Sequence, residues 1–286
     1  MKLSIITVNF NNRDGLQKTI DSVVSQTFRD FEWIVIDGGS TDGSKKLIEQ
    51  YADHFAYWVS EPDKGIYNAM NKGIKAAKGD YLQFLNSGDW LFTPDTLEQV
   101  FNLNRREDII FGASLVHDPF AGDYFLNPDE NISAFELLST SLPHQASFIK
   151  HSIFKEIGLY DESYRIVADM KFFYEAIIQK NKSLFHVPFT IVHYDGSGLS
   201  NQSMSTVKEE TLRVIDSFLS DRFKSDFLIY NDVILSKKML DKKKETSIEE
   251  KKAIRLYKTM MRYWPTRIIT QLLYQLLITS KRQKNV

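Results

Sequence analysis

Four short apolar runs shape the first 90 residues of the chain, and each is followed by polar or chain-breaking residues. They cover residues 3–8, 31–36, 57–59 and 81–85, and helical patterns separate them. Runs of this length that are rich in β-branched and aromatic residues suit buried strands. Strands that alternate with helices at short spacing indicate a largely parallel, doubly wound α/β sheet. At 286 residues and 43% hydrophobic content, the chain can bury such a core.

Carboxylate and amide side chains follow the ends of these runs. Ligands of open α/β sheets bind at the carboxyl ends of the strands, so we expect these side chains to gather at one edge. The alternative is that each is an ordinary turn residue. The set comprises Asn9, Asp37, Asp42, Asp63 and Asp89.

The most informative run is 81–90, in which a buried strand ends in Asn-Ser-Gly-Asp. A hard divalent cation prefers oxygen ligands and often shares one or two carboxylates with the phosphates of a substrate. The pattern therefore predicts that Asp89 holds such a metal.

Several classes of protein are excluded or disfavoured. GxxxxGK[ST] is absent, and GxGxxG does not follow the first run, which disfavours a P-loop or a classical dinucleotide site. A net charge of -1 argues against a general nucleic-acid binder. The absence of cysteine rules out disulfides, thiolate metal sites and a cysteine nucleophile. The first apolar run is too short for a signal peptide, and no window of about 18 residues is apolar enough to span a membrane, so we expect a soluble or peripheral protein.

The second half is less regular. We expect a strand at 108–111, a loop or hairpin at 120–131, and a strand at 185–192 that Pro188 marks as an edge strand. His193 then opens a glycine-containing loop that reads either as a lid or as an ordinary connection.

From residue 204 the pattern changes to amphipathic helix, so we divide the chain into a domain at 1–203 and a helical extension at 204–286. The charge run at 237–252 reads as a solvated face or linker. The apolar stripe at 254–278 has basic flanks, which suit a membrane surface equally as well as packing against the core or a second subunit.

Four segments resemble the GT-A glycosyltransferases of family 2, particularly bacterial enzymes of polysaccharide assembly. The resemblance runs from Lys2 to about Ser200. Its segments are Ser-Ile-Ile-Thr-Val-Asn-Phe-Asn at 4–11, Asp-Gly-Gly-Ser-Thr-Asp-Gly at 37–43, the stretch 60–73, and Phe-Leu-Asn-Ser-Gly-Asp at 84–89. Each segment alone is weak evidence for the family, but four such segments in this order are specific for it.

The resemblance implies a GT-A fold and inverting transfer of a sugar from a nucleotide-activated donor, with Mn²⁺ or Mg²⁺. Asp37 would contact the nucleobase, and Asp89 would correspond to the last carboxylate of the DXD metal motif, whose first carboxylate is replaced here by Ser87. The residues implied for nucleotide binding are Thr7, Asn9, Asp37, Asp63, Lys64, Ser87 and Gly88.

The resemblance also implies that Asp169 is the catalytic base, because an inverting displacement must deprotonate the incoming hydroxyl. The alternative for Asp169 is a helix N-cap. His193 would add a further metal ligand; the alternative is that it is an ordinary exposed loop residue. His144 and Gln145 would lie on the acceptor side; the alternative is that they make only a structural hydrogen bond.

The expected function is transfer from a nucleotide sugar, with uridine expected before guanosine, to a glycan or lipid-linked glycan. We expect a cytoplasmic protein, held at the inner face of the cell membrane if the tail binds lipid, or a homo-oligomer if the tail pairs. Two rivals are a sugar-phosphate nucleotidyltransferase and a catalytically inactive glycan-binding protein.

Overall fold

The computed structural model describes residues 1–198, 203–229 and 231. The chain divides into two units, Met1–Thr211 and Leu212–Val286. The charge run at 237–252 and the apolar stripe at 254–278 lie outside the described residues, so what was predicted for them stays a prediction. Within the described part, no helix has the length and apolarity that a membrane span requires.

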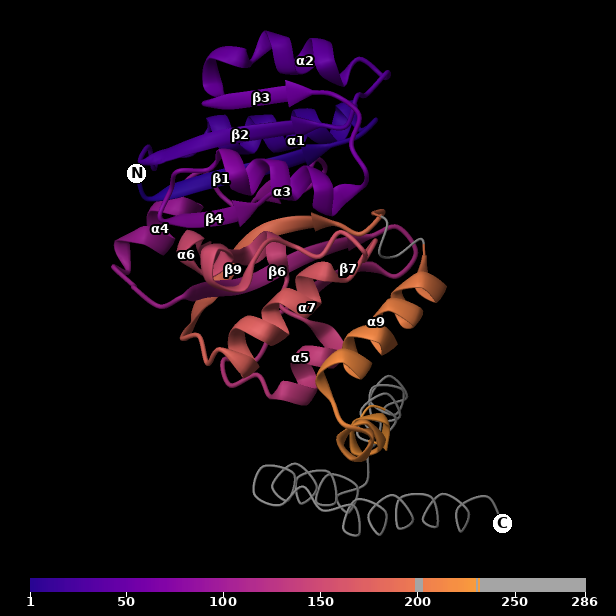
Figure 1. Ribbon diagram of the computed structural model, residues 1–286. Helices are drawn as coiled ribbons and strands as arrows, with labels where there is room; N and C mark the ends of the chain where they lie inside the picture. Colours follow the sequence, from indigo (N-terminus) through magenta and orange to yellow (C-terminus); the bar gives the residue numbers. More distant parts are fainter. Residues whose placement is uncertain (199–202, 230, 232–286) are drawn as a thin grey trace. The chain divides into compact units, whose positions relative to one another are not determined.

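A nine-stranded sheet organises the first unit, in the order β3-β2-β1-β4-β8-β6-β9-β5 with β7 paired to β6 (Figure 1). The four strands predicted first are mutually parallel: β1 (Leu3–Asn9), β2 (Phe31–Asp37), β3 (Tyr57–Ser60) and β4 (Tyr81–Phe84). β6 (Ile109–Asp118) and β9 (Leu184–Asp195) run the same way, whereas β5 (Trp90–Leu91), β7 (Gly122–Leu126) and β8 (Ser147–Lys150) oppose them. The predicted α/β fold with a mostly parallel sheet is confirmed.

Helices cover the sheet because their apolar stripes need a partner. On α1, for example, Leu16, Ile20 and Val23 are fully buried. β1 and β2 are buried along nearly their whole length, as parallel strands covered on both faces must be. The described helices are α1 (Arg13–Val24), α2 (Ser44–Gln50), η1 (Ala52–His54), α3 (Ile66–Ala76), α4 (Thr96–Asn102), α5 (Ala134–Thr140), η2 (His144–Ala146), α6 (His151–Ile157), α7 (Ala168–Tyr174), the π-helical η3 (Glu175–Gln179) and α9 (Met204–Phe218).

β9 differs from the sequence-based expectation in two ways. It is not an edge strand, because it lies between β6 and β5, and Pro188 sits where the β6–β9 register shifts. A bulge accommodates proline because no ladder hydrogen bond is needed there. The strand also continues to Asp195, so His193 lies inside it, paired with Trp90 and Leu115, rather than opening the following loop.

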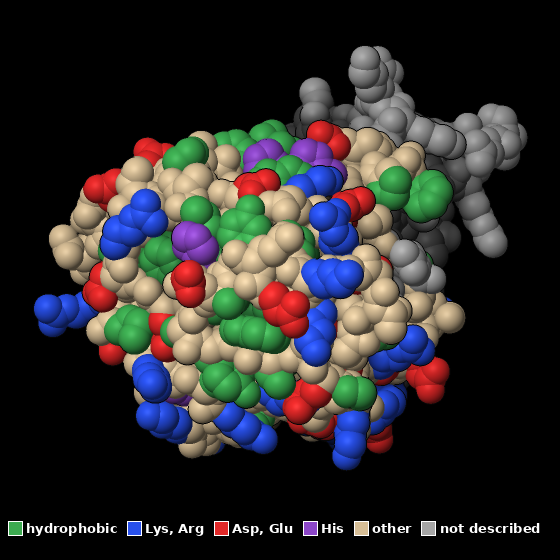
Figure 2. All heavy atoms as spheres, turned by 90° about the horizontal axis from the view of Figure 1, so that it is seen from above, with side chains coloured by type: hydrophobic (Ala, Val, Ile, Leu, Met, Phe, Trp, Pro, Cys, Tyr) green, Lys and Arg blue, Asp and Glu red, His purple; other side chains and the backbone are tan. Residues whose placement is uncertain are grey.

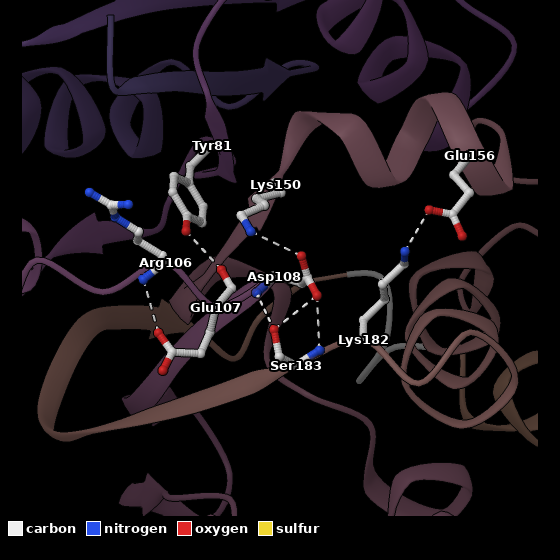
Figure 3. A network of polar contacts seen from close by, with 8 residues as sticks. All are labelled: Tyr81, Arg106, Glu107, Asp108, Lys150, Glu156, Lys182 and Ser183. Atoms are coloured by element: carbon white, nitrogen blue, oxygen red, sulfur yellow. Dashed lines mark hydrogen bonds and ion pairs between the residues drawn. The ribbon is translucent and has the colours of Figure 1, made fainter.

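A polar network fixes the edge at which the parallel strands begin (Figure 3). Asp108 accepts hydrogen bonds from the Ser183 backbone and hydroxyl and from Lys150 Nζ, all within 3.0 Å. Nearby, the Tyr81 hydroxyl donates to the Glu107 carbonyl oxygen at 2.7 Å. These contacts join the starts of β4, β6 and β9 to the end of β8. This edge is opposite the one that carries the predicted site.

Candidate active site

The ends of β1, β2 and β3 meet around Asp37, as predicted. The Asp37 carboxylate is fully buried and accepts hydrogen bonds from Asn9 Nδ2 at 2.7 Å, from Ser60 Oγ at 2.6 Å, and from the Ser40 backbone and hydroxyl at 3.0 and 2.5 Å. Burial alone would raise the Asp37 pKa, but these bonds together hold it below its ordinary value. Asp37 is therefore a fixed anion at the carboxyl edge of the sheet.

The neighbouring residues of the predicted nucleoside pocket fall into two groups. Asp63 lies beside Gly38, where a Cβ atom would come within 2.6 Å of the Asp63 carboxylate, and Lys64 is exposed on the same turn. Thr7 lies instead inside the sheet, fully buried, and accepts a hydrogen bond from Trp33 Nε1 at 3.0 Å. The Thr7 side chain thus packs in the core, while Asp63 lies beside Gly38, the residue that follows Asp37.

The Asn-Ser-Gly-Asp turn after β4 is held from α1. Thr19 Oγ1 donates to the Asp89 carbonyl oxygen at 2.7 Å and accepts the Gly88 N–H at 3.2 Å. Gly88 has φ of 105°, and a Cβ there would lie 2.9 Å from Asp195 Oδ2. Asp89 Oδ1 in turn accepts the Asp195 backbone N–H at 3.0 Å. The structure therefore brings the end of β9 directly onto this turn, against Gly88 and Asp89.

Asp89 is 4% exposed. Burial raises its pKa to about 7, although the Asp195 N–H, His144 and a side-chain hydrogen bond from Gln145 all act to lower it. A buried carboxylate that is costly to ionise fits a divalent cation, which would stabilise its charge. Among the described residues no group of three His, Cys, Asp or Glu side chains is placed to hold a metal.

His193 lies in an aromatic cluster. Its Nδ1 is 2.8 Å from His117 Nε2, and the Trp90 ring stacks on both imidazoles, with centroids 4.6 and 5.0 Å away. His117 Nδ1 is also 3.0 Å from Asp123. The hydrogen-bonding contact between β9 and Asp89 thus comes from Asp195, whereas His193 as a metal ligand stays a prediction.

On the face in Figure 2, histidines border hydrophobic side chains, and positive and negative side chains are interspersed.

Asp169 lies in the first turn of α7 and is not capping it through its side chain. Its Oδ2 is 2.9 Å from His144 Nδ1, and its Oδ1 is 2.8 Å from the Tyr67 hydroxyl. Burial would raise the Asp169 pKa, but the contacts with His144 and Tyr67 bring it below the ordinary value. Asp169 is thus an ionised carboxylate at neutral pH.

One short turn contacts both carboxylates. In η2, His144 contacts Asp169, and the side chain of its neighbour Gln145 lies close enough to Asp89 to lower the pKa of that carboxyl. The Gln145 carbonyl oxygen accepts from Gln83 Nε2 of β4 at 2.9 Å, which ties the turn to the central sheet. The predicted acceptor-side residues therefore join the predicted base to the predicted metal ligand.

Sequence reasoning missed four residues that touch this site: Ser60, Tyr67, Asn86 and Asp195. Ser60 ends β3 next to Asp37, so the same strand-end argument would have found it. Asn86 lies within the recognised turn. Tyr67 and Asp195 carried no local signal, because their partners are 102 and 106 residues away in the chain.

Comparisons with known proteins identify the family of the chain. A family model described as Glycosyl transferase family 2 matches residues 4–166. An uncharacterized glycosyltransferase of Mycobacterium tuberculosis is 38% identical over 186 residues, 62% of this chain and 69% of that protein. A PGL/p-HBAD biosynthesis glycosyltransferase of Mycobacterium bovis is 31% identical over 178 residues, 59% of this chain and 67% of that one.

Solved structures share the fold at lower identity. Residues 1–349 of S. aureus TarS, in complex with UDP, align with a TM-score of 0.57 and 17% identity, covering 81% of this chain and 70% of that one. A mannosyltransferase from Pyrobaculum calidifontis, with GDP-Man and Mn²⁺, aligns with a TM-score of 0.53 and 12% identity, covering 98% and 86%. The fold is therefore GT-A, and with the family match over residues 4–166 the chain belongs to glycosyl transferase family 2.

Proposed function

We propose that this chain transfers a sugar with inversion from a nucleotide-diphosphate sugar, a UDP-sugar first among them, to a hydroxyl of a glycan or lipid-linked glycan. One observation carries the proposal: a single turn, η2, contacts both the ionised Asp169 and the buried Asp89. A base and a leaving-group site must lie on opposite sides of the reacting carbon, at a fixed separation. A shared support fixes that separation.

The donor's nucleoside would lie over the carboxyl ends of β1 to β3, against Asp37, Asp63 and Lys64. The UDP bound to TarS supports uridine as the base, while the GDP-Man bound to the mannosyltransferase is the reason to test guanosine as well. The diphosphate would lie at the turn of Ser87 and Gly88.

Asp89 would hold Mn²⁺ or Mg²⁺ together with the diphosphate, and the ion would offset the charge that develops on the leaving group. The mannosyltransferase neighbour, solved with Mn²⁺, supports this cofactor. Asp195, held against Asp89, would border the same phosphates.

Asp169 would act as general base. It takes the proton of the acceptor hydroxyl as that oxygen bonds to the anomeric carbon, and the bond from this carbon to the diphosphate breaks with its electron pair. The M. bovis relative's name, a biosynthesis glycosyltransferase, supports a role in glycan assembly.

The test is a thermal-shift panel of nucleoside diphosphates and nucleotide sugars with and without Mn²⁺, followed by transfer assays with the donor that binds. Ligands of the native state raise the melting temperature by mass action. We expect a Mn²⁺-dependent shift with UDP or a UDP-sugar that Asp89→Asn abolishes. Asp169→Asn should keep donor binding and lose at least about 10²-fold in kcat.

The matched control is Asp53→Asn, an exposed aspartate of η1 near the opposite edge. It should behave as the wild type. No shift with any nucleotide, or full activity in Asp169→Asn, would refute the proposal. Transfer with retained anomeric configuration would refute the inverting mechanism alone.

A further inference from the structure

His144 and Asp169 form a shielded pair. Their side chains are 17% and 15% exposed, and 2.9 Å separates His144 Nδ1 from Asp169 Oδ2. The other oxygen of Asp169 already faces the Tyr67 hydroxyl. Each carboxylate oxygen therefore has one fixed neighbour, which sets the directions in which its remaining lone pairs point.

The surroundings of the imidazole fix its tautomer. The ionised Asp169 can only accept, so His144 Nδ1 must carry a proton. Asn86 Nδ2, an amide donor, lies 3.3 Å from His144 Nε2. A ring that donates at Nδ1 and accepts at Nε2 has a matching neighbour at each nitrogen.

Asn86 connects this pair to the donor side. It opens the Asn-Ser-Gly-Asp turn that ends in Asp89, and its own Oδ1 is buried without a hydrogen-bond partner. The ionisable groups that interact with Asp169 are His144, Tyr67 and Tyr160, from η2, α3 and the loop before α7. His144 interacts in addition with Asp89.

We propose that His144 is a positioning residue of the reaction: its Nδ1–H holds Asp169 in the orientation that accepts the acceptor's proton, and Asn86 fixes the tautomer by donating to Nε2. The inference rests on the proposed function and deepens it. His144 keeps its own proton throughout. The hydroxyl proton moves to Asp169, the oxygen–carbon bond forms, and the electron pair of the broken bond leaves with the diphosphate.

The kinetic test compares His144→Ala with His144→Asn. The Asn side chain places an N–H donor where Nδ1 lies and has no ring to titrate, so it should restore most of the activity. We expect Ala to lower kcat about 10- to 100-fold, less than loss of the base itself. UDP affinity should stay unchanged, which also shows that the variant is folded. His54→Asn, on η1, is the matched control and should match the wild type.

The pH profile provides a second readout. Loss of the Nδ1–H bond lets the Asp169 pKa rise, so the acid limb of kcat/KM should move to higher pH in His144→Ala and stay near the wild-type position in His144→Asn. Equal kcat in Ala and wild type, or no movement of the acid limb, would overturn the proposal.

A test that does not depend on activity is to determine which nitrogen of the His144 ring carries the proton. The ¹⁵N shifts of the His144 ring, assigned by difference with His144→Asn, should show protonation at Nδ1, and this preference should be lost in Asp169→Ala. Protonation at Nε2 alone would overturn the inference even in an active enzyme. A wild type without transferase activity would refute the proposed function, and the ring shifts would still decide the pairing.

Discussion

Glu210 of α9 accepts the backbone N–H of Ile166 at 2.9 Å, three residues before Asp169. The same buried carboxylate accepts the N–H groups of Arg165 and Val167, at 2.6 and 3.3 Å. The Ile166 carbonyl oxygen lies 2.5 Å from the Tyr67 hydroxyl, which also faces Asp169. The segment that leads into α7 is thus shaped from two sides, and the loop amides have their partner in a helix beyond the family match.

Glu210→Ala should therefore weaken both stability and catalysis. It leaves three backbone N–H groups without their acceptor, which should lower the free energy of unfolding by about 1–3 kcal/mol or more. Glu210→Gln keeps one acceptor oxygen and should lie between Ala and wild type. Urea denaturation and kcat measure the two effects. Glu209→Gln, exposed on the same helix, is the control. An Ala variant as stable as the wild type would contradict this prediction.

Metal binding at Asp89 should depend on pH. Its folded pKa of about 7 lies above the ordinary value of 3.8. Because burial favours the protonated carboxyl, the contribution of Asp89 to the free energy of unfolding is fully present below about pH 3.8 and is lost as the pH rises through about 7. In metal-free protein at pH 8, Asp89→Asn should be more stable than the wild type, by at most about 4 kcal/mol.

Because Mn²⁺ compensates the ionised carboxylate, its thermal shift should be larger at pH 8 than at pH 6. Asp89→Asn should abolish this difference, whereas Asp95→Asn, an exposed aspartate, should preserve it. An equal Mn²⁺ shift at both values of pH in the wild type would count against Asp89 as the ligand.

Ser87→Asp should strengthen Mn²⁺ binding, because it restores the carboxylate that the resembling family has at this position. A second hard oxygen ligand on the same turn favours the ion. Electron paramagnetic resonance of free Mn²⁺ measures the affinity directly. Ser152→Asp introduces the same charge at the start of α6 and should leave the affinity unchanged. Unchanged affinity in Ser87→Asp would show that residue 87 faces away from the ion.

Ser60→Ala should weaken nucleotide binding through Asp37. Loss of one donor to a buried carboxylate costs about 1–3 kcal/mol of stability, and a less fixed Asp37 should lower UDP affinity about three- to tenfold. Calorimetric titration with UDP gives the affinity, and the exposed Ser25→Ala is the control. A Ser60→Ala variant that binds UDP like the wild type would argue against Asp37 as the nucleobase contact.

The first half of the fold could be predicted because the end of each strand is visible in the sequence as a change from apolar to polar residues. The apolar runs of β1 and β2 stop at Asn9 and Asp37, and parallel pairing then requires these two residues to be neighbours. The prediction needed no knowledge of distant contacts. Asp89 followed from the same rule applied to β4.

The second half could not be read this way. β9 looked complete at Val192, and only its pairing with β6 and with Trp90 carries it on to Asp195. The contact between Tyr67 and Asp169 depends on how the starts of α3 and α7 pack together, which no periodicity in the sequence encodes. The roles of His144 and Gln145 were predicted as acceptor-side, but their direct contacts with the two carboxylates emerge only from tertiary packing.

The three-residue turn η2 has a consequence for the order of events. His144 and Gln145 are consecutive residues of this turn, and their side chains lie against Asp169 and Asp89. The position of the proposed base is therefore linked to the position of the proposed metal ligand before any substrate binds. A movement that repositions one end should displace the other, so donor and acceptor would sense each other through the turn without touching. A substitution that loosens the backbone of the turn, such as Pro143→Gly, should then change the kinetics of both substrates together, unlike truncation of the His144 side chain alone.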